Sequence, residues 1–238
     1  GNGSNVLVRD KGIRGIVIKL GNMLRHFYEA EDLLVFGSGY SLALASYKAM
    51  ECGKTGMEFA VGIPGSIGGA VYMNAGAYDG EMQNIVNCVK VMDLQGNERV
   101  LYAEELNFGY RKTSLQNSGL IVTEVTLKMP SGNKDEIKSK MDDFSHRRIS
   151  KQPLEMPSAG SMFKRPPGYF AGTLIDQAGL KGYTVGGAQI STKHAGFVVN
   201  VGGATAADVL QLIKDVQTKI KAGVGVELQP EVLVIGEE

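Results

Sequence analysis

The stretch Gly62–Ala70 is the part of the sequence that says most about chemistry. It reads Gly-Ile-Pro-Gly-Ser-Ile-Gly-Gly-Ala and is followed by Asn74-Ala75-Gly76-Ala77-Tyr78. Glycines at 65, 68 and 69 remove side chains from consecutive turns, so backbone N–H groups can converge on an anion such as a pyrophosphate. A purely structural glycine turn would give the same pattern. The Gly-Lys-Ser/Thr ending of a Walker phosphate loop is absent, which excludes that kind of nucleotide site.

Three further side chains suit anion binding or proton transfer. Arg111 follows a glycine and a tyrosine and could present its guanidinium to a carboxylate or phosphate. Ser161 precedes two cations but does not match the Gly-x-Ser-x-Gly pattern of a nucleophile elbow. Glu231 carries a carboxylate into a terminal apolar run. A surface arginine, a turn serine and a solvent-facing carboxylate remain as plain structural alternatives.

Composition narrows the class of protein. The chain has 238 residues, enough for one large domain or two small ones, and 32 of them are glycine. Because 25 basic residues balance 25 acidic ones, no charge pattern for nucleic acid or a membrane surface is present. The two cysteines and three histidines are scattered, so we expect no metal site and no disulfide framework. The uncharged run 59–78 is rich in glycine and reads as a system of loops, not a membrane helix. With no secretory signal visible, we expect a soluble protein of a reducing compartment.

Hydrophobic periodicity and turn residues predict the elements that position these side chains. Local signals are clearest for two helices, one capped by Asn133 and one opened by a capping box of Thr205 and Asp208 and ended by Gly223. Strands and helices in two segregated blocks, with a change of composition at 129–133, indicate an α+β fold. The predicted strands are 6–8, 16–20, 33–36, 86–94, 98–102, 120–128, 196–201 and 232–235, and the other predicted helices are 42–52 and 173–178.

The order of the motifs resembles one family. Gly1–Asn5, the two glycine motifs, Tyr110-Arg111, Ala159-Gly160-Ser161, His194-Ala195 and Pro230-Glu231-Val232 are similar, in sequence order, to the UDP-N-acetylenolpyruvoylglucosamine reductases. These flavoenzymes complete UDP-N-acetylmuramate for peptidoglycan. The resemblance covers essentially the whole chain.

The resemblance implies an FAD-binding domain of the vanillyl-alcohol-oxidase (PCMH) type at 1–128, a smaller α+β substrate-binding domain at 129–228, and a last strand, 229–238, that returns to the FAD side. It also implies that an N-terminal part of the FAD domain is missing. The short connection at 129–133 indicates the loop-less (type II) subclass. Two departures from the family pattern stand out: Gly196 where Asn is common, and Leu233 where Arg is usual.

The resemblance also assigns residues to roles. Ser161 would be the general acid, with Arg111 and Glu231 as the other catalytic residues. Tyr78, Lys151, Arg165 and His194 would bind the substrate. The residues that the resemblance places at FAD are Gly1, Asn2, Gly3, Ser4, Asn5, Gly62, Ile63, Pro64, Gly65, Ser66, Gly68, Gly69, Asn74, Gly76 and Ala77.

The implied activity is an NADPH-dependent, FAD-dependent reduction of UDP-N-acetylglucosamine enolpyruvate by a monomeric cytoplasmic enzyme without nucleic-acid or membrane partners. Hydride would go to C3 of the enolpyruvyl group and a proton from Ser161 to C2. Two alternatives stay open: another flavin oxidoreductase of the same fold that acts on a sugar or alcohol, and a glycine-rich nucleotide-binding regulator without catalysis.

Overall fold

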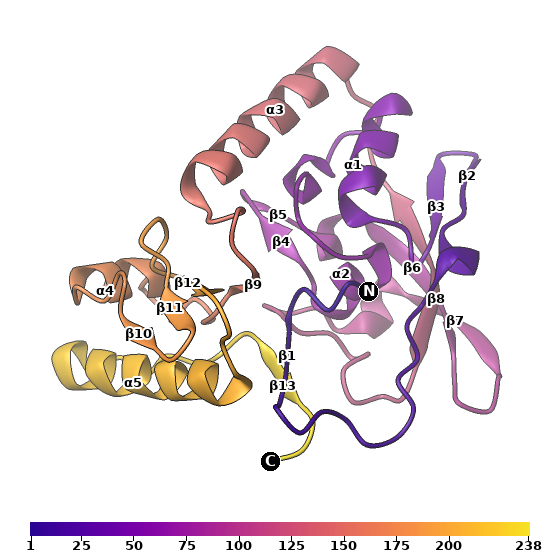
Figure 1. Cartoon of the computed structure of the whole chain (residues 1–238). Helices are drawn as coiled ribbons and strands as arrows, with labels where there is room; N and C mark the ends of the chain where they lie inside the picture. The colour runs from indigo at the N-terminus through magenta and orange to yellow at the C-terminus, as the bar shows by residue number, and fades with distance from the viewer. The chain divides into compact units, whose positions relative to one another are not determined.

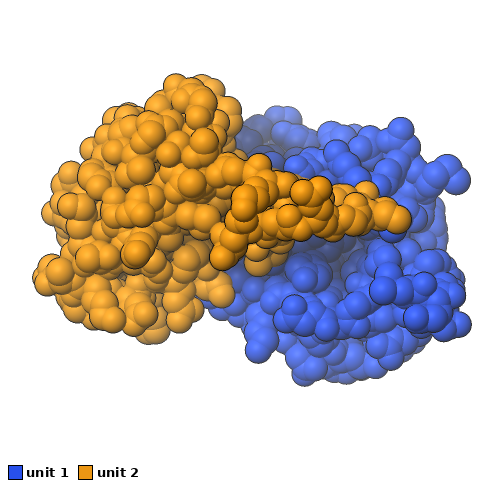
Figure 2. All heavy atoms as spheres, turned by 60° about the horizontal axis from the view of Figure 1, so that its bottom comes forward, with its two compact units in different colours: residues 1–2, 18–148 blue, residues 3–17, 149–238 orange.

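The computed structural model describes residues 1–238, which form two compact units (Figures 1 and 2). Unit 1 comprises Gly1–Asn2 and Ile18–Arg148, and unit 2 comprises Gly3–Val17 and Ile149–Glu238. The boundary between the two units lies after Arg148, which is later in the sequence than the change of composition at 129–133. The reason is helix α3 (Lys134–Lys151), whose apolar face packs in unit 1 as far as residue 148.

Unit 1 is built on a five-stranded antiparallel sheet in the order β2-β3-β8-β6-β7. Helices α1 (Leu42–Glu51) and α2 (Ile67–Tyr72) pack in the core of this unit (Figure 1). Alternating side chains from the strands, such as Phe36, Val89 and Val125, are fully buried in that core. The strands are β2 (Phe27–Ala30), β3 (Leu33–Gly37), β6 (Val86–Met92), β7 (Glu98–Tyr102) and β8 (Ile121–Lys128).

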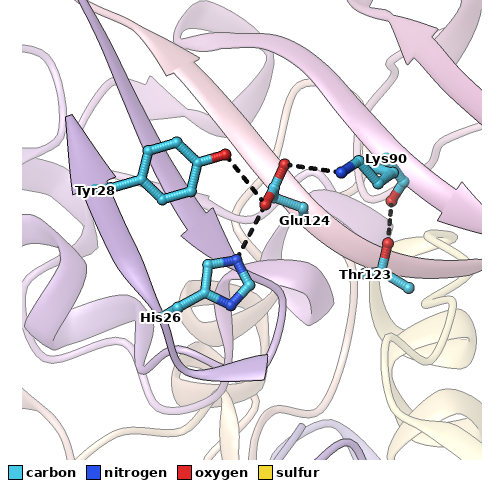
Figure 3. Close-up of polar contacts among 5 residues, drawn as sticks. All are labelled: His26, Tyr28, Lys90, Thr123 and Glu124. Carbon is cyan, nitrogen blue, oxygen red and sulfur yellow. Dashed lines mark hydrogen bonds and ion pairs between the residues drawn. The ribbon is translucent and has the colours of Figure 1, made fainter. Parts of the chain in front are cut away.

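A network of polar side chains joins three strands on the solvent side of this sheet (Figure 3). The carboxylate of Glu124 lies 3.0 Å from Nε2 of His26 and accepts a hydrogen bond from the Tyr28 hydroxyl at 3.4 Å. Its other oxygen lies 3.6 Å from Nζ of Lys90 on the neighbouring strand. Exposed ion pairs individually contribute little to the free energy of folding, so the buried face of the sheet supplies most of the stability. We interpret this network as favouring the observed pairing of the strands.

Helix α3 begins where the sequence predicts. The side chain of Asn133 accepts hydrogen bonds from the N–H groups of Asp135 and Glu136 at 2.9 and 3.2 Å. The apolar stripe of this helix is buried and packs against Val61, which lies just before the Gly62 turn. Helix α3 therefore covers the glycine motif within unit 1. The stripe consists of Ile137, Met141 and Phe144.

Unit 2 contains a four-stranded antiparallel sheet in the order β10-β11-β12-β9, with α4 (Ala171–Gln177) and α5 (Ala206–Val224) packed in its core. The predicted capping box of α5 is present, with the Thr205 hydroxyl accepting from the Asp208 N–H at 3.1 Å. The helix is terminated by Gly225, after Val224, and not by the predicted Gly223, because Gly225 is the residue that adopts the left-handed conformation, with φ of 74°. The strands are β9 (Ser158–Ser161), β10 (Thr184–Val185), β11 (Ala188–Ile190) and β12 (Phe197–Asn200).

The first and the last strand of the chain pair in unit 2. Strand β1 (Val6–Val8) pairs in parallel with β13 (Leu233–Ile235), and Val6 lies opposite Leu233. This pairing places the loop that precedes β1 beside the segment that carries Glu231.

One predicted strand is wrong and several short elements were not foreseen. Residues 16–20 form no strand, because no other strand pairs with them, and Ile16 is 92% exposed.

None of the helices is long and apolar enough to cross a membrane. The remaining short elements are η1 (Asn22–Leu24), η2 (Glu58–Ala60), β4 (Gly76–Ala77), β5 (Gly80–Glu81), η3 (Met82–Asn84) and η4 (Ala103–Leu106).

Candidate functional site

The glycine motif of unit 1 folds as a tight turn that leads into a short helix. The prediction of loops throughout 59–78 is wrong at α2, because the Ser66 hydroxyl caps the helix by accepting from the Gly69 N–H at 3.3 Å. Gly65 has φ of 123°, a conformation that favours glycine. At Gly68, a Cβ atom would lie only 2.7 Å from Cβ of Ser38, so this position also requires glycine. Gly65 therefore allows the turn, and Gly68, which is buried, allows α2 to approach Ser38 closely.

The turn at Gly65 is hydrogen-bonded to the residues that follow the turn Gly37-Ser38-Gly39 at the end of β3. The N–H of Leu42 donates to the carbonyl of Gly65 at 3.1 Å, and the N–H of Ile67 donates to the carbonyl of Tyr40 at 2.9 Å. Within unit 1, Gly1 lies against the same turn, since a Cβ atom at residue 1 would be 3.0 Å from Oγ of Ser66. The turn at 37–39 and the glycine motif at 62–70 are distant in sequence but thus lie side by side in unit 1.

Asn74 and Arg111 organise the segment that follows α2. The amide nitrogen of Asn74 donates to a carboxylate oxygen of Glu81 at 3.1 Å and to the carbonyl of Gly109 at 3.0 Å, and its side chain is fully buried. The guanidinium of Arg111 donates to the carbonyl of Gly76 at 3.2 Å. Asn74 therefore holds the β4–β5 hairpin against the turn of Arg111, and this buried side chain serves to position its neighbours.

Tyr78 lies beside the C-terminal half of α3. Its ring stacks on Phe144, with centroids 4.4 Å apart and an interplanar angle of 13°. The guanidinium of Arg148 lies 5.6 Å from the centroid of the Tyr78 ring, and burial lowers the pKa of Arg148 from its ordinary value. The sequence places Arg148 at the end of a helix but gives no sign that it packs on Tyr78 and the Gly62 turn, because that contact depends on how α3 packs.

In unit 2, the peptide groups of Met162 join the two candidate acid–base residues. The N–H of Met162 donates to the carbonyl of Gly196 at 2.8 Å, and its carbonyl accepts from the N–H of Glu231 at 2.8 Å. Ser161, the residue before Met162, is exposed at the end of β9 and lies opposite Phe197 of β12. The hydroxyl and the carboxylate are thus carried by adjacent backbone segments that are distant in sequence.

His194 lies in the turn that precedes β12, the strand whose Phe197 is opposite Ser161. Its Nδ1 accepts a hydrogen bond from the N–H of Gly196 at 3.1 Å, and its ring meets Phe197 edge-on at 5.0 Å. Burial lowers the pKa of His194 below its ordinary value of 6.5, and nearby Lys181 and Lys151 lower it further. His194 is therefore a neutral ring at pH 7 with a proton on Nε2.

The two candidate cations of the substrate site lie at exposed positions. Lys151 is the last residue of α3. The guanidinium carbon of Arg165 lies 3.9 Å from the centroid of the Phe170 ring, a cation–π contact that restricts its orientation. Phe170, which precedes α4, was not singled out from the sequence.

Two family profiles match the chain. One, described as the C-terminal domain of UDP-N-acetylenolpyruvoylglucosamine reductase, matches residues 152–235, and the other, described as an FAD-binding domain, matches residues 1–101. A reductase of this name from Clostridium perfringens (strain SM101) is 52% identical over 238 residues, which are 100% of this chain and 78% of the relative. The corresponding protein of Geobacillus thermodenitrificans is 50% identical, with the same coverage. The chain belongs to the family of UDP-N-acetylenolpyruvoylglucosamine reductases.

A solved structure agrees with this assignment. The crystal structure of the reductase from Thermus caldophilus superimposes with a TM-score of 0.86 at 41% sequence identity, over 98% of this chain and 83% of that one. The α+β fold with an FAD-binding domain, predicted from the sequence, is confirmed.

The residues of this reductase fit the cofactor that its family uses. FAD carries a pyrophosphate, and the turn at Gly65 offers backbone without a side chain to such a group. The turn at Gly3, with φ of 66°, offers backbone of the same kind at the start of β1. The two residues that depart from the family pattern both make defined contacts. The N–H of Gly196 donates to Nδ1 of His194, and Leu233 pairs with Val6.

Proposed function

We propose that this chain reduces UDP-N-acetylglucosamine enolpyruvate to UDP-N-acetylmuramate, with NADPH as the electron donor and FAD as the cofactor. Membership of the reductase family and the match to an FAD-binding domain support this function. When bound, FAD would supply the hydride chemistry that links NADPH to C3 of the enolpyruvyl group, and the backbone of the turn at Gly65 would hold its pyrophosphate. The protein has to supply a proton at C2 and stabilise the charge that develops on the substrate carboxylate.

The hydrogen bond from the Glu231 N–H to the Met162 carbonyl is the observation that carries the assignment of catalytic residues. It places a carboxylate and the hydroxyl of Ser161 on adjoining segments of one unit. We assign Ser161 as the acid that protonates C2 and Glu231 as the group that holds the enol-like form by a hydrogen bond. Hydride at C3 and a proton at C2 saturate the double bond, and Ser161 regains its proton from water.

An alcohol is a weak acid, so the alkoxide that Ser161 leaves needs positive charge nearby. The sequence supplies Lys164 and Arg165 directly after this segment. Lys164 is held by its N–H, which donates to the carbonyl of Gln229 at 2.8 Å, and Arg165 is oriented by Phe170. We assign these two cations to charge stabilisation and Arg165 also to the diphosphate of the substrate.

Arg111 completes the assignment from unit 1. Its hydrogen bond to the carbonyl of Gly76 anchors the guanidinium beside the Gly76–Tyr78 segment. A guanidinium is the side chain best suited to bind a planar carboxylate, so we assign Arg111 to the carboxylate of the enolpyruvyl group and Tyr78 to the substrate next to it. Lys151 is assigned to the UDP moiety, and His194 to a polar contact with the substrate.

An oxidase of a sugar or alcohol on the same flavin fold is not favoured. The relatives that match the full length of this chain carry the reductase name, and one family profile describes the C-terminal domain of that enzyme. The free thiols of Cys52 and Cys88 suit a cytoplasmic enzyme, where nucleotide sugars and NADPH are available.

Stopped-flow absorbance of the flavin tests the proposal, because it follows the two half-reactions separately. Ser161→Ala should allow reduction of the flavin by NADPH at close to the normal rate, since that step needs no proton at C2. Reoxidation by the enolpyruvate substrate should slow by about 10²- to 10⁴-fold. Ser161→Cys should keep part of the activity, and Ser158→Ala, on the same strand, should behave as the unchanged protein. A slow reductive half with a normal oxidative half would overturn the role of Ser161.

A further inference from the structure

Asn5 connects the glycine-rich loop at the start of β1 to the peptide of Glu231. Its side-chain nitrogen donates to the carbonyl of Glu231 at 3.2 Å. Its own carbonyl accepts a hydrogen bond from the N–H of Leu233 at 3.0 Å. One residue of the loop thus binds the segment of Glu231 twice, once through its side chain and once through its backbone.

The side-chain bond replaces a backbone bond of the β1–β13 ladder. In a regular parallel ladder with Val6 opposite Leu233, the backbone N–H of residue 5 would donate to the carbonyl of Glu231. Here the amide of the Asn5 side chain occupies that acceptor. The backbone N–H of Asn5 is therefore not committed to the ladder and can belong to the loop. Asparagine suits this position because its short amide reaches an adjacent strand and donates.

The opposite side of Glu231 is also held. Its N–H donates to Met162 at 2.8 Å, so its carbonyl and its N–H are bound by two different segments. A residue whose backbone is held on both sides has little freedom to move its carboxylate along the strand. Removing the Asn5 contact would release one side and leave a half-buried carbonyl without its donor.

We propose that Asn5 is a positioning residue for Glu231: its side chain fixes the peptide of the acid–base carboxylate, while its backbone belongs to the cofactor loop. This inference rests on the proposed role of Glu231. It separates two functions of one residue, since FAD would meet the backbone of the loop and Glu231 the side chain.

Asn5→Leu tests whether the side chain of Asn5 serves Glu231 while its backbone serves FAD. Leucine has a similar volume to asparagine but cannot donate a hydrogen bond. It also adds no charge near a pyrophosphate. Fluorescence titration should give an FAD dissociation constant within about threefold of the original. The rate of flavin reduction by NADPH should also be retained. Reoxidation by the enolpyruvate substrate should slow by about 10- to 100-fold, since small misplacements of a reacting group have effects of this size. Asn22→Leu, which changes an exposed asparagine of η1, is the matched control.

A double-mutant cycle with Glu231→Gln decides whether Asn5 acts through Glu231. If it does, adding Asn5→Leu to Glu231→Gln should slow reoxidation by less than about twofold. A full additional loss in the double variant, or a loss of FAD affinity that accounts for the slower rate, would overturn the inference and leave the role of Glu231 intact. A normal reoxidation rate in Glu231→Gln alone would overturn the proposed role of Glu231 and the inference with it. If thermal unfolding shows that Asn5→Leu does not fold, Asn5→Ala provides the same comparison.

Discussion

The N–H of Gly196 and Nδ1 of His194 form a hydrogen bond of 3.1 Å within one short turn of unit 2. Because Nδ1 accepts this bond, the proton of the neutral ring must lie on Nε2. A Cβ atom at residue 196 would lie 3.1 Å from Cε1 of His194, so any larger residue would press on the ring. The backbone N–H of residue 196 therefore sets the tautomer of His194, and the absence of a Cβ atom there leaves room for its ring.

The first prediction concerns the pH dependence of stability. Burial lowers the pKa of His194 below 6.5, so between that value and the lower pKa of the folded state the unfolded chain binds more protons. The free energy of unfolding should consequently decrease as the pH falls below about 6.5. Urea unfolding between pH 5 and pH 8 measures this slope, and His194→Gln should reduce it. His146→Gln, at an exposed position of α3, is the control and should leave the slope unchanged. Equal slopes in the original protein and His194→Gln would contradict the prediction.

The second prediction concerns Asp10, which caps α5 from a distant part of unit 2. Its carboxylate accepts hydrogen bonds from the N–H groups of Ala206 and Ala207 at 2.7 and 2.9 Å, at the positive end of the helix. Asp10→Ala should lower the free energy of unfolding by about 0.5–2 kcal/mol, as the loss of a helix cap does. Urea denaturation monitored by circular dichroism measures the change. Lys11→Ala alters the neighbouring exposed residue and should have little effect, so equal midpoints for both variants would show that the cap does not stabilise the helix.

The sequence predicted those features whose signals are local. Helix α5 was predicted because Thr205 and Asp208 form a capping box three residues apart, and the structure confirms it. Strands β6 and β7 were likewise predicted, as 86–94 and 98–102, and the structure has both. Strand 16–20 was wrong because a strand exists only with a partner, which local periodicity does not reveal.

Contacts between distant segments explain what the sequence could not show of the site. Motif order assigned Ser161 and Glu231 to one reaction, but nothing in either motif indicates that Met162 binds the peptide of Glu231. The contact of Asn5 with Glu231 depends in the same way on the pairing of β1 with β13. Such pairings place the site residues, and they follow from the packing of the whole unit.

The third prediction uses two adjacent glycines of α2 with opposite surroundings. At Gly68 a Cβ atom would lie 2.7 Å from Cβ of Ser38, whereas at Gly69 the nearest atom would be Oγ of Ser66 at 3.5 Å. Gly68→Ala should therefore destabilise the protein by about 1–3 kcal/mol, as overpacking does. Gly69→Ala should be neutral or stabilising by about 0.5–1 kcal/mol, because alanine favours a helix over glycine. Thermal unfolding measures both.

FAD titration of the same pair links the geometry of this turn to the cofactor. The close approach of α2 to Ser38 shapes the turn that we assign to the pyrophosphate, so Gly68→Ala should also weaken FAD binding. Equal stability and equal FAD affinity in the two variants would show that the approach of α2 to Ser38 is not required.

The last prediction concerns Lys151, which the family resemblance assigns to the UDP moiety of the substrate. It is exposed at the C-terminal end of α3, and a charge-assisted hydrogen bond from such a side chain contributes about 1.5–3 kcal/mol. Lys151→Ala should therefore weaken binding of the UDP substrate by roughly 10- to 100-fold. Flavin reduction by NADPH should change much less, because that step does not use the UDP moiety. Isothermal titration with the substrate and stopped-flow reduction measure the two effects. Lys214→Ala removes an exposed lysine from α5 and controls for the loss of one positive charge. If substrate affinity falls equally in both variants, general electrostatic attraction and not a specific contact of Lys151 accounts for the loss.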